Sequence, residues 1–205
     1  MTQRIRIGLI GLSTTSKVTS WATKAHLPYL QSEQGLKHFQ IVALCNTSKA
    51  SGKKSIEEYK LDESVKTYDS PEDLAQDPDV DLVVNVTGVE QHYPAIIPSV
   101  KAGKNVFTEL PLAQTMEQMQ ELVQTAREKK IKTVFGMQGQ TSPVTKVVKD
   151  IITSGKIGKV LSATWTGTAG FLGEKPLPIG VSQFLARKVG ANMMTVQFLH
   201  SSYLL

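Results

Sequence analysis

The sequence predicts an α/β fold: a doubly wound parallel sheet, followed by the start of an α+β domain with an open, mostly antiparallel sheet. Three observations predict it. Short apolar runs alternate with segments of helical periodicity. The best run, residues 80–87, has apolar residues at consecutive positions, which is typical of a strand buried on both faces. After about residue 140 the alternation stops, so residues 1–140 and 141–205 are predicted as two domains, the second incomplete.

The elements of the first domain are expected in regular order. Ser70, Pro71 and Asp73 mark one helix start, with serine as N-cap and proline at the first helical position. Thr115 and Gln118 form a capping box, and Gly103 closes the preceding helix. Strands are expected at residues 5–12, 40–45, 65–68, 80–87, 105–108 and 133–137, and helices at 17–30, 46–61, from 70, 92–102 and 115–130.

The second domain is expected to open with a helix over residues 142–154. A strand is expected over residues 159–166, with Leu161, Ala163 and Trp165 on one face. Glycine- and proline-containing sequence follows, and then a helix through residues 193 and 194. The chain ends on apolar residues, so a fragment of a longer protein is one of the alternatives.

Composition excludes several classes of protein. The 205 residues are 40% hydrophobic and 20% charged, which are typical values for a globular protein. The net charge is +5, but the lysines and arginines are interspersed with acidic residues along the chain and form no basic stripe. We therefore expect no direct contact with nucleic acid. Four scattered histidines and one cysteine show no metal-ligand spacing, and Cys45 in an apolar strand is predicted to be a buried small hydrophobe. With no membrane-spanning run, a soluble protein of the cytoplasm or nucleus is expected.

The first strand ends in a turn suited to a phosphate. Gly8 and Gly11 close an apolar run and are followed by Leu12 and Ser13, so a helix N-terminus is expected beneath the pyrophosphate of a dinucleotide. The G-x-G-x-x-G fingerprint is incomplete, because serines stand where its second and third glycines would fall. A strand end that binds nothing remains the alternative.

A longer segment resembles a known family. Residues 101–113 read Lys-Ala-Gly-Lys-Asn-Val-Phe-Thr-Glu-Leu-Pro-Leu-Ala and follow a buried strand. This stretch resembles the motif A-G-K-x-V-x-x-E-K-P-L-A of the glucose–fructose oxidoreductase, inositol dehydrogenase and rhizopine-catabolism (Gfo/Idh/MocA) family of NAD(P)-dependent oxidoreductases. The resemblance implies a Rossmann domain in residues 1–140 and the beginning of the family's substrate and dimerisation domain in residues 141–205.

Within that family, four stretches resemble the branch of the galactose-pathway repressor of yeasts. They are residues 8–12, 21–26, 39–44 and 137–143. The resemblance implies a transcription regulator of fungal origin that binds a dinucleotide without turning it over and contacts a regulatory protein. A homodimer is implied if the second domain is complete.

The resemblance also implies roles for individual residues. Gly8, Gly11, Leu12 and Ser13 would hold the pyrophosphate, and Asn46 would lie at the adenosine ribose. Ser48 or Lys49 would contact a 2′-phosphate, so NAD and NADP both stay open, with a slight preference for NADP. Asn46 as a helix cap is the alternative. Thr87 and His92 follow the fourth strand, where ligands of such sheets lie. His92 as a helix cap is weighed equally. Glu109 would receive the nicotinamide ribose or simply end its strand.

One family residue is missing. Leu110 stands between Glu109 and Pro111, where the motif has a lysine that is thought to assist proton transfer. A leucine has neither proton nor charge to offer. His200 is the remaining candidate for proton transfer, whereas His26 is expected to be structural. Two functions follow: a non-catalytic, dinucleotide-sensing regulator, or a dehydrogenase acting on a sugar or polyol hydroxyl.

Overall fold

The computed structural model describes residues 3–15, 20–164, 166, 190, 192, 195–196 and 200. The chain divides into two compact units, Met1–Gly136 and Met137–Leu205.

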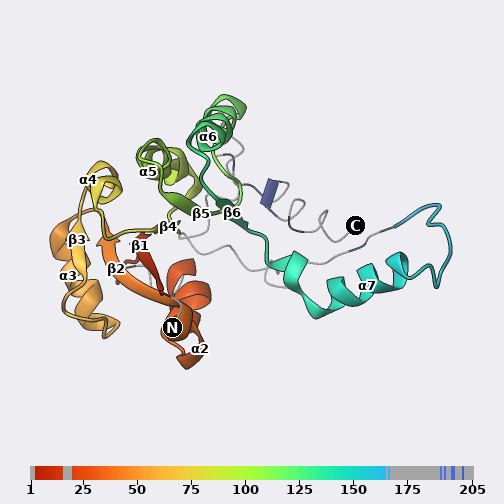
Figure 1. Ribbon diagram of the computed structural model, residues 1–205, viewed down its shortest axis with the longest axis horizontal. Helices are drawn as coiled ribbons and strands as arrows, with labels where there is room; N and C mark the ends of the chain where they lie inside the picture. Colours follow the sequence, from red (N-terminus) through yellow and green to blue (C-terminus); the bar gives the residue numbers. More distant parts are fainter. Residues whose placement is uncertain are drawn as a thin grey trace, which may run out of the picture. The chain divides into compact units, whose positions relative to one another are not determined.

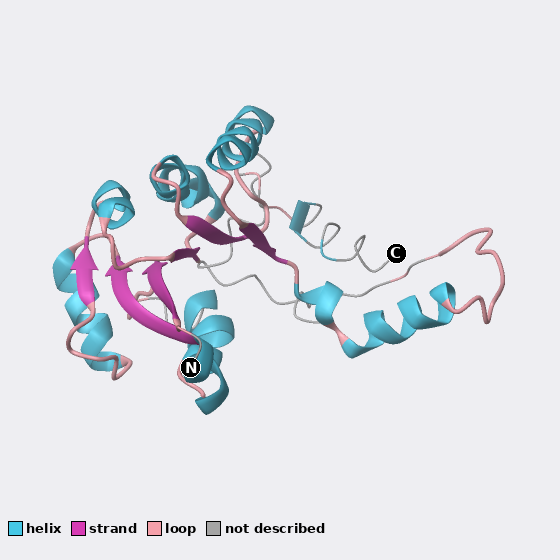
Figure 2. Ribbon diagram, viewed as in Figure 1, coloured by secondary structure: helices cyan, strands magenta, loops and turns pink. Residues whose placement is uncertain are grey.

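The first unit contains a six-stranded sheet in which every neighbouring pair is parallel. The strand order is β3-β2-β1-β4-β5-β6, so the chain builds outward from β1 in one direction and then returns to build in the other (Figure 2). This confirms the doubly wound parallel sheet. The strands are β1 (Ile5–Ile10), β2 (Phe39–Cys45), β3 (Lys66–Tyr68), β4 (Leu82–Asn85), β5 (Asn105–Glu109) and β6 (Thr133–Gly136).

Helices cover both faces of this sheet. Apolar residues of α4, α5 and α6 form one core cluster with the sheet, and those of η1, α1 and α3 form a second cluster on the other face. Figure 1 shows α4, α5 and α6 ranged along one side. The helical elements are η1 (Ala22–His26, a π-helix), α1 (Leu27–Leu30), α2 (Glu33–His38), α3 (Lys49–Glu58), α4 (Pro71–Gln76), α5 (Val89–Lys101) and α6 (Met116–Lys129).

Neighbouring residues of the central strands belong to opposite cores. In β1, Leu9 packs in the cluster of η1 and α3, and Ile10 packs in the cluster of α4 and α5. In β2, Leu44 and Cys45 divide in the same way. Successive side chains of a strand point to opposite faces, so a sheet covered on both faces needs apolar residues at consecutive positions. This explains the unbroken apolar runs of the sequence.

Helix starts follow the expected capping chemistry in several places. The hydroxyl of Ser70 accepts a hydrogen bond from the Asp73 N–H, and that of Thr115 accepts one from the Gln118 N–H. Gly103 has a φ of +81° just past the end of α5, as its expected closing role requires. The N-cap of α3 is Ser48, whose hydroxyl accepts from the Ser51 N–H, so the alternative of Asn46 as the cap is wrong.

The helix predicted over residues 17–30 differs from the structure. Its described part consists of η1 and α1, and a separate α2 follows with Ser32 as its N-cap. Pro28 has no N–H to donate to a carbonyl of the preceding turn, so a regular α-helical ladder is interrupted there. Ser32 then accepts from the Gly35 N–H and starts a new helix that the sequence analysis did not expect.

The second unit begins with a 3₁₀ helix, η2 (Gln138–Thr141), and α7 (Pro143–Thr153). The predicted strand at residues 159–166 is wrong for its described part, since residues 159–164 and 166 form no strand. A strand needs a hydrogen-bonded neighbour, and the described residues supply none there, since Leu161 is 87% exposed. The helix through residues 193 and 194 falls outside the described residues, and an antiparallel sheet remains a prediction. In the described part of the chain, no helix is long and apolar enough to cross a membrane.

Candidate functional site

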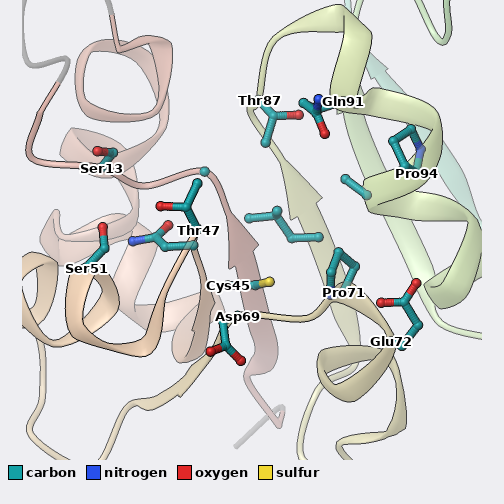
Figure 3. Close-up of a pocket in the computed structure, with 14 residues that line it drawn as sticks. Ser13, Cys45, Thr47, Ser51, Asp69, Pro71, Glu72, Thr87, Gln91 and Pro94 are labelled. Atoms are coloured by element: carbon teal, nitrogen blue, oxygen red, sulfur yellow. The ribbon is translucent and has the colours of Figure 1, made fainter.

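A cavity of about 400 Å³ opens at the carboxyl ends of the central strands (Figure 3). This is the edge at which open parallel α/β sheets bind ligands, and the cavity lies where the strand order reverses. Its lining comes from the ends of β1, β2, β3 and β4 and the helices that follow them: Ile10, Gly11, Ser13, Cys45, Asn46, Thr47, Ser51, Asp69, Pro71, Glu72, Thr87, Gln91, Pro94 and Ala95.

Gly11 occupies a position that only glycine fits. Its φ is +96°, and a Cβ there would lie 2.9 Å from Thr87 Cγ2 and 3.2 Å from the Thr87 backbone nitrogen. The Gly11 N–H donates to the Cys45 carbonyl over 3.0 Å. The turn after β1 is thus fixed between β2 and the end of β4, and its backbone forms part of the cavity wall.

Gly8 does not belong to this turn, so that expectation is wrong. It lies inside β1, where a Cβ would meet Val80 Cγ1 at 3.0 Å and Leu74 Cδ1 at 3.1 Å. Its role is to let α4 and the segment before β4 pack closely against the sheet. The Leu12 side chain is also buried and does not reach the cavity. Ser13 does line the cavity, and its carbonyl accepts from the Tyr59 hydroxyl over 3.0 Å.

Asn46 follows β2 directly and has a fixed orientation. Its Nδ2 donates to the Leu12 carbonyl over 2.7 Å and contacts Ser55 Oγ at 3.4 Å. The residue is 9% exposed, and its Oδ1 has no hydrogen-bond partner among the described residues. A buried acceptor without a donor is costly, so this atom marks a position suited to a ligand hydroxyl.

Ser48 and Lys49, the candidates for contacting a 2′-phosphate, do not line the cavity. The Ser48 hydroxyl caps α3, and Lys49 is exposed at the first position of that helix. The structure therefore brings together Gly11, Ser13, Asn46 and Thr87, but not these two residues.

Thr87 lines the cavity, whereas His92 is buried and does not belong to the lining. The Thr87 hydroxyl donates to Asn85 Oδ1 over 2.9 Å. His92 is 2% exposed, with Nδ1 2.7 Å from the Pro111 carbonyl and Nε2 3.1 Å from the Thr87 carbonyl. Burial lowers the pKa of His92, although both carbonyls favour its protonated form. Since α5 begins at Val89 with Gly88 as N-cap, the alternative of His92 as a helix cap is wrong.

Glu109 ends β5 and binds two side chains from the segment after β1. Its Oε1 lies 2.7 Å from His26 Nε2 and accepts from Trp21 Nε1 over 3.1 Å. The His26 ring meets Phe107 edge-on, with ring centroids 5.2 Å apart. A Cβ on Gly136 would lie 2.1 Å from Glu109 Oε2, so the carboxylate rests against a bare backbone. This cluster of Trp21, His26 and Glu109 is separate from the lining of the cavity.

Two acidic lining residues were missed by the sequence analysis. Asp69 directly follows β3, and Glu72 lies in the first turn of α4. Their place after a strand end was the available signal, by the same rule that singled out Thr87. The link between His26 and Glu109 had no such signal, because 83 residues separate them and only the fold brings them together.

The described residues show neither a reactive thiol nor a metal site. Burial raises the pKa of the Cys45 thiol to about 12, so this residue is a neutral, buried side chain as predicted. No group of three or more histidine, cysteine or acidic residues in the described ranges could hold a metal ion. His200 belongs to the second unit, and its role in proton transfer stays a prediction.

The fold and the cavity together define a Rossmann-type nucleotide-binding protein. A family model described as an oxidoreductase family with an NAD-binding Rossmann fold matches residues 5–137, and the chain belongs to this Gfo/Idh/MocA family.

Relatives within the family include both enzymes and regulators. The chain is 31% identical over 163 residues to dehydrogenase aclE of Aspergillus oryzae, covering 79% of this chain and 43% of that protein. It is 29% identical over 180 residues to the galactose/lactose metabolism regulatory protein GAL80 of Saccharomyces cerevisiae, covering 84% of this chain and 40% of that protein. The chain thus spans less than half the length of these two relatives.

Solved structures agree with this assignment. A super-repressor mutant of Gal80p from Saccharomyces cerevisiae matches with a TM-score of 0.84 and 26% identity, covering 99% of this chain and 52% of that one. Gal80p from Kluyveromyces lactis matches with a TM-score of 0.81 and 26% identity, covering 98% of this chain and 49% of that one.

Proposed function

We propose that this chain binds a nicotinamide dinucleotide in the cavity at the ends of β1, β2 and β4, and that it serves as a non-catalytic, dinucleotide-sensing regulator. The Gly11 turn is suited to the pyrophosphate because its backbone forms the cavity wall without a side chain in the way. When bound, the dinucleotide would supply a nicotinamide ring able to exchange hydride. The family supports a nicotinamide dinucleotide and leaves open the choice between NAD and NADP, for which the sequence slightly favoured NADP.

One observation carries the choice of regulator over enzyme. Leu110 follows β5 where the resemblance implies a lysine for proton transfer. Losing a positioned acid–base group typically removes a factor of roughly 100 to 10,000 in rate. The likeness to GAL80 over 84% of this chain supports the same choice. As a regulator, the protein would bind a protein partner, act in the cytoplasm or nucleus, and come from a fungus. A homodimer would require a complete second domain.

Two measurements test the proposal. A thermal melt of the purified chain should shift upward with one dinucleotide, by the equivalent of roughly 2.7 kcal/mol at about 100 times the dissociation constant. Incubation with NAD or NADP and a panel of sugars and polyols should then give no reduced cofactor. Substrate-dependent reduction at a useful rate would refute the non-catalytic reading, and a melt unmoved by every dinucleotide would refute binding.

A dehydrogenase acting on a sugar or polyol is the second candidate. The His26–Glu109 pair favours it, because a carboxylate that holds one imidazole nitrogen leaves the other available as a proton acceptor. In this case a His26→Ala or His200→Ala variant should lose turnover while keeping cofactor binding. If both variants retain turnover, neither histidine is the acid–base group.

A further inference from the structure

We propose that the cavity selects NAD over NADP, through the fixed acceptor of Asn46 and the two carboxylates of Asp69 and Glu72. This inference rests on the proposed dinucleotide site. In Rossmann folds the side chain at the end of the second strand lies at the adenosine 2′ position, which carries a hydroxyl in NAD and a phosphate in NADP. Asn46 occupies that place, directly after β2.

The Asn46 amide is oriented so that its oxygen, and not its nitrogen, lacks a hydrogen-bond partner. Its Nδ2 is 2.7 Å from the Leu12 carbonyl, so rotating the amide by half a turn would bring two oxygens together. Its Oδ1 therefore stays the unpaired atom. A ribose hydroxyl can donate to it, whereas a phosphate dianion offers only acceptor oxygens.

The charged residues that line the cavity also favour NAD over NADP. Its charged residues among those described are two acids, Asp69 and Glu72. In Figure 3 these two lie across the cavity from Ser13 and Thr87. The Asn46 N–H donates to the Tyr68 carbonyl over 3.1 Å, so Asp69, the next residue, lies close to the Asn46 backbone. Like charges brought together in a binding site oppose association, so a 2′-phosphate is disfavoured there.

A cavity that favours NAD is the opposite of the slight preference for NADP that the sequence suggested. That preference treated the Asn46 amide as indifferent to the 2′ substituent and relied on Ser48 and Lys49 for the phosphate. The structure uses the Ser48 hydroxyl to cap α3 and leaves Lys49 outside the cavity lining.

Calorimetric titration of the full chain with NAD and NADP tests the proposal. We expect NAD to bind about tenfold tighter or more, with a preference that shrinks as salt is added. The Asp69→Asn, Glu72→Gln double variant should strengthen NADP binding about tenfold and NAD binding by a clearly smaller factor, so the ratio of the two affinities should fall. The matched control is Asp73→Asn, an exposed acid of α4 outside the lining, which should change neither affinity.

A change in the ligand tests Asn46 without risk to folding. NAD lacking its adenosine 2′-hydroxyl should bind roughly fivefold to tenfold more weakly than NAD, because Oδ1 would again lack a donor. NAD lacking the adenosine 3′-hydroxyl is the comparison and should lose less.

The outcomes separate this inference from the function it rests on. NADP binding as tightly as NAD, or unchanged NADP binding in the double variant, would overturn the selection while leaving the dinucleotide site intact. If neither cofactor binds the folded chain, the proposed function fails and this inference fails with it.

Discussion

Replacing Gly11 by alanine should destabilise the first unit more than the same change at an unconstrained glycine. Two costs add at this position. The φ of +96° is strained for any L-residue, which costs about 1 to 2 kcal/mol. The new methyl group would also lie 2.9 Å from Thr87 Cγ2 and close to backbone atoms that cannot easily move, an overpacking cost of about 1 to 3 kcal/mol.

Gly103 provides the matched control. It has a comparable φ of +81°, but a Cβ there would meet nothing within 4 Å. Gly103→Ala therefore carries the backbone strain without the clash. The two variants should differ by about 2 kcal/mol in the free energy of unfolding, or roughly 4 to 8 °C in melting temperature.

Urea unfolding and thermal melts of both variants measure this difference. The melt with the favoured dinucleotide adds a second readout, since Gly11→Ala should also weaken binding by moving the turn that lines the cavity, whereas Gly103→Ala should not. Equal destabilisation by the two substitutions would show that the close approach of the turn to Thr87 does not exist in solution, and the reasoning about this site would fail.

Three further predictions concern single side chains. Glu109→Ala should lower the free energy of unfolding by about 1 to 3 kcal/mol in urea titrations, because it leaves the His26 and Trp21 donors without their acceptor. Asp77→Asn should reduce the loss of stability seen in melts as pH falls below about 4, because an amide cannot take up the proton that Asp77 does. Cys45 should resist alkylation at pH 8 in the folded chain and react readily in denaturant, as mass spectrometry of the labelled protein would record.

The sign of the pH effect follows from the contacts of Asp77. Burial alone would raise the pKa of Asp77, but hydrogen bonds from the Asp79 N–H, Lys66 and Tyr68 outweigh it and hold the pKa below its ordinary value. Lys66 Nζ lies 3.0 Å from Asp77 Oδ1, and the Tyr68 hydroxyl donates over 2.9 Å. A depressed pKa stabilises the fold above the unfolded-state pKa, and this contribution is lost as pH falls through the folded-state value.

Each of these predictions has a control and a contrary result. Glu63→Ala, at an exposed site, should cost little, and an equal cost for Glu109→Ala would mean that the bonds to His26 and Trp21 contribute nothing. Asp150→Asn on the exposed surface of α7 should leave the acid dependence unchanged. Rapid labelling of Cys45 at pH 8 in the folded chain would contradict its burial.

The parts of the fold predicted from sequence are those set by local pattern. Consecutive apolar residues predicted strands that are buried on both faces. Ser70 and Thr115 predicted helix starts, because their side chains cap nearby backbone N–H groups. The break after η1 and the extra α2 were missed because Pro28 lies within an apolar pattern that resembles one continuous helix. The predicted strand at residues 159–166 depended on a partner strand, which local sequence does not supply.

Residues of the candidate site could be predicted from the sequence only where their place directly after a strand determines their location. Gly11, Asn46 and Thr87 each follow a central strand, and the topology brings such residues to one edge. Orientation was not accessible from sequence: that Asn46 presents an oxygen depends on where the Leu12 carbonyl lies. Gly8 was assigned to the turn because glycine serves both tight turns and close packing, and only the neighbouring Val80 and Leu74 distinguish the two uses.

His92 contacts two loops, the one that follows β4 and the one that follows β5. One of its nitrogens is near the Thr87 carbonyl, and the other is near the Pro111 carbonyl beside Leu110. The ring is buried, so it packs between the two backbone segments. A shift of the loop after β5 would therefore disturb the Thr87 segment that lines the candidate cavity.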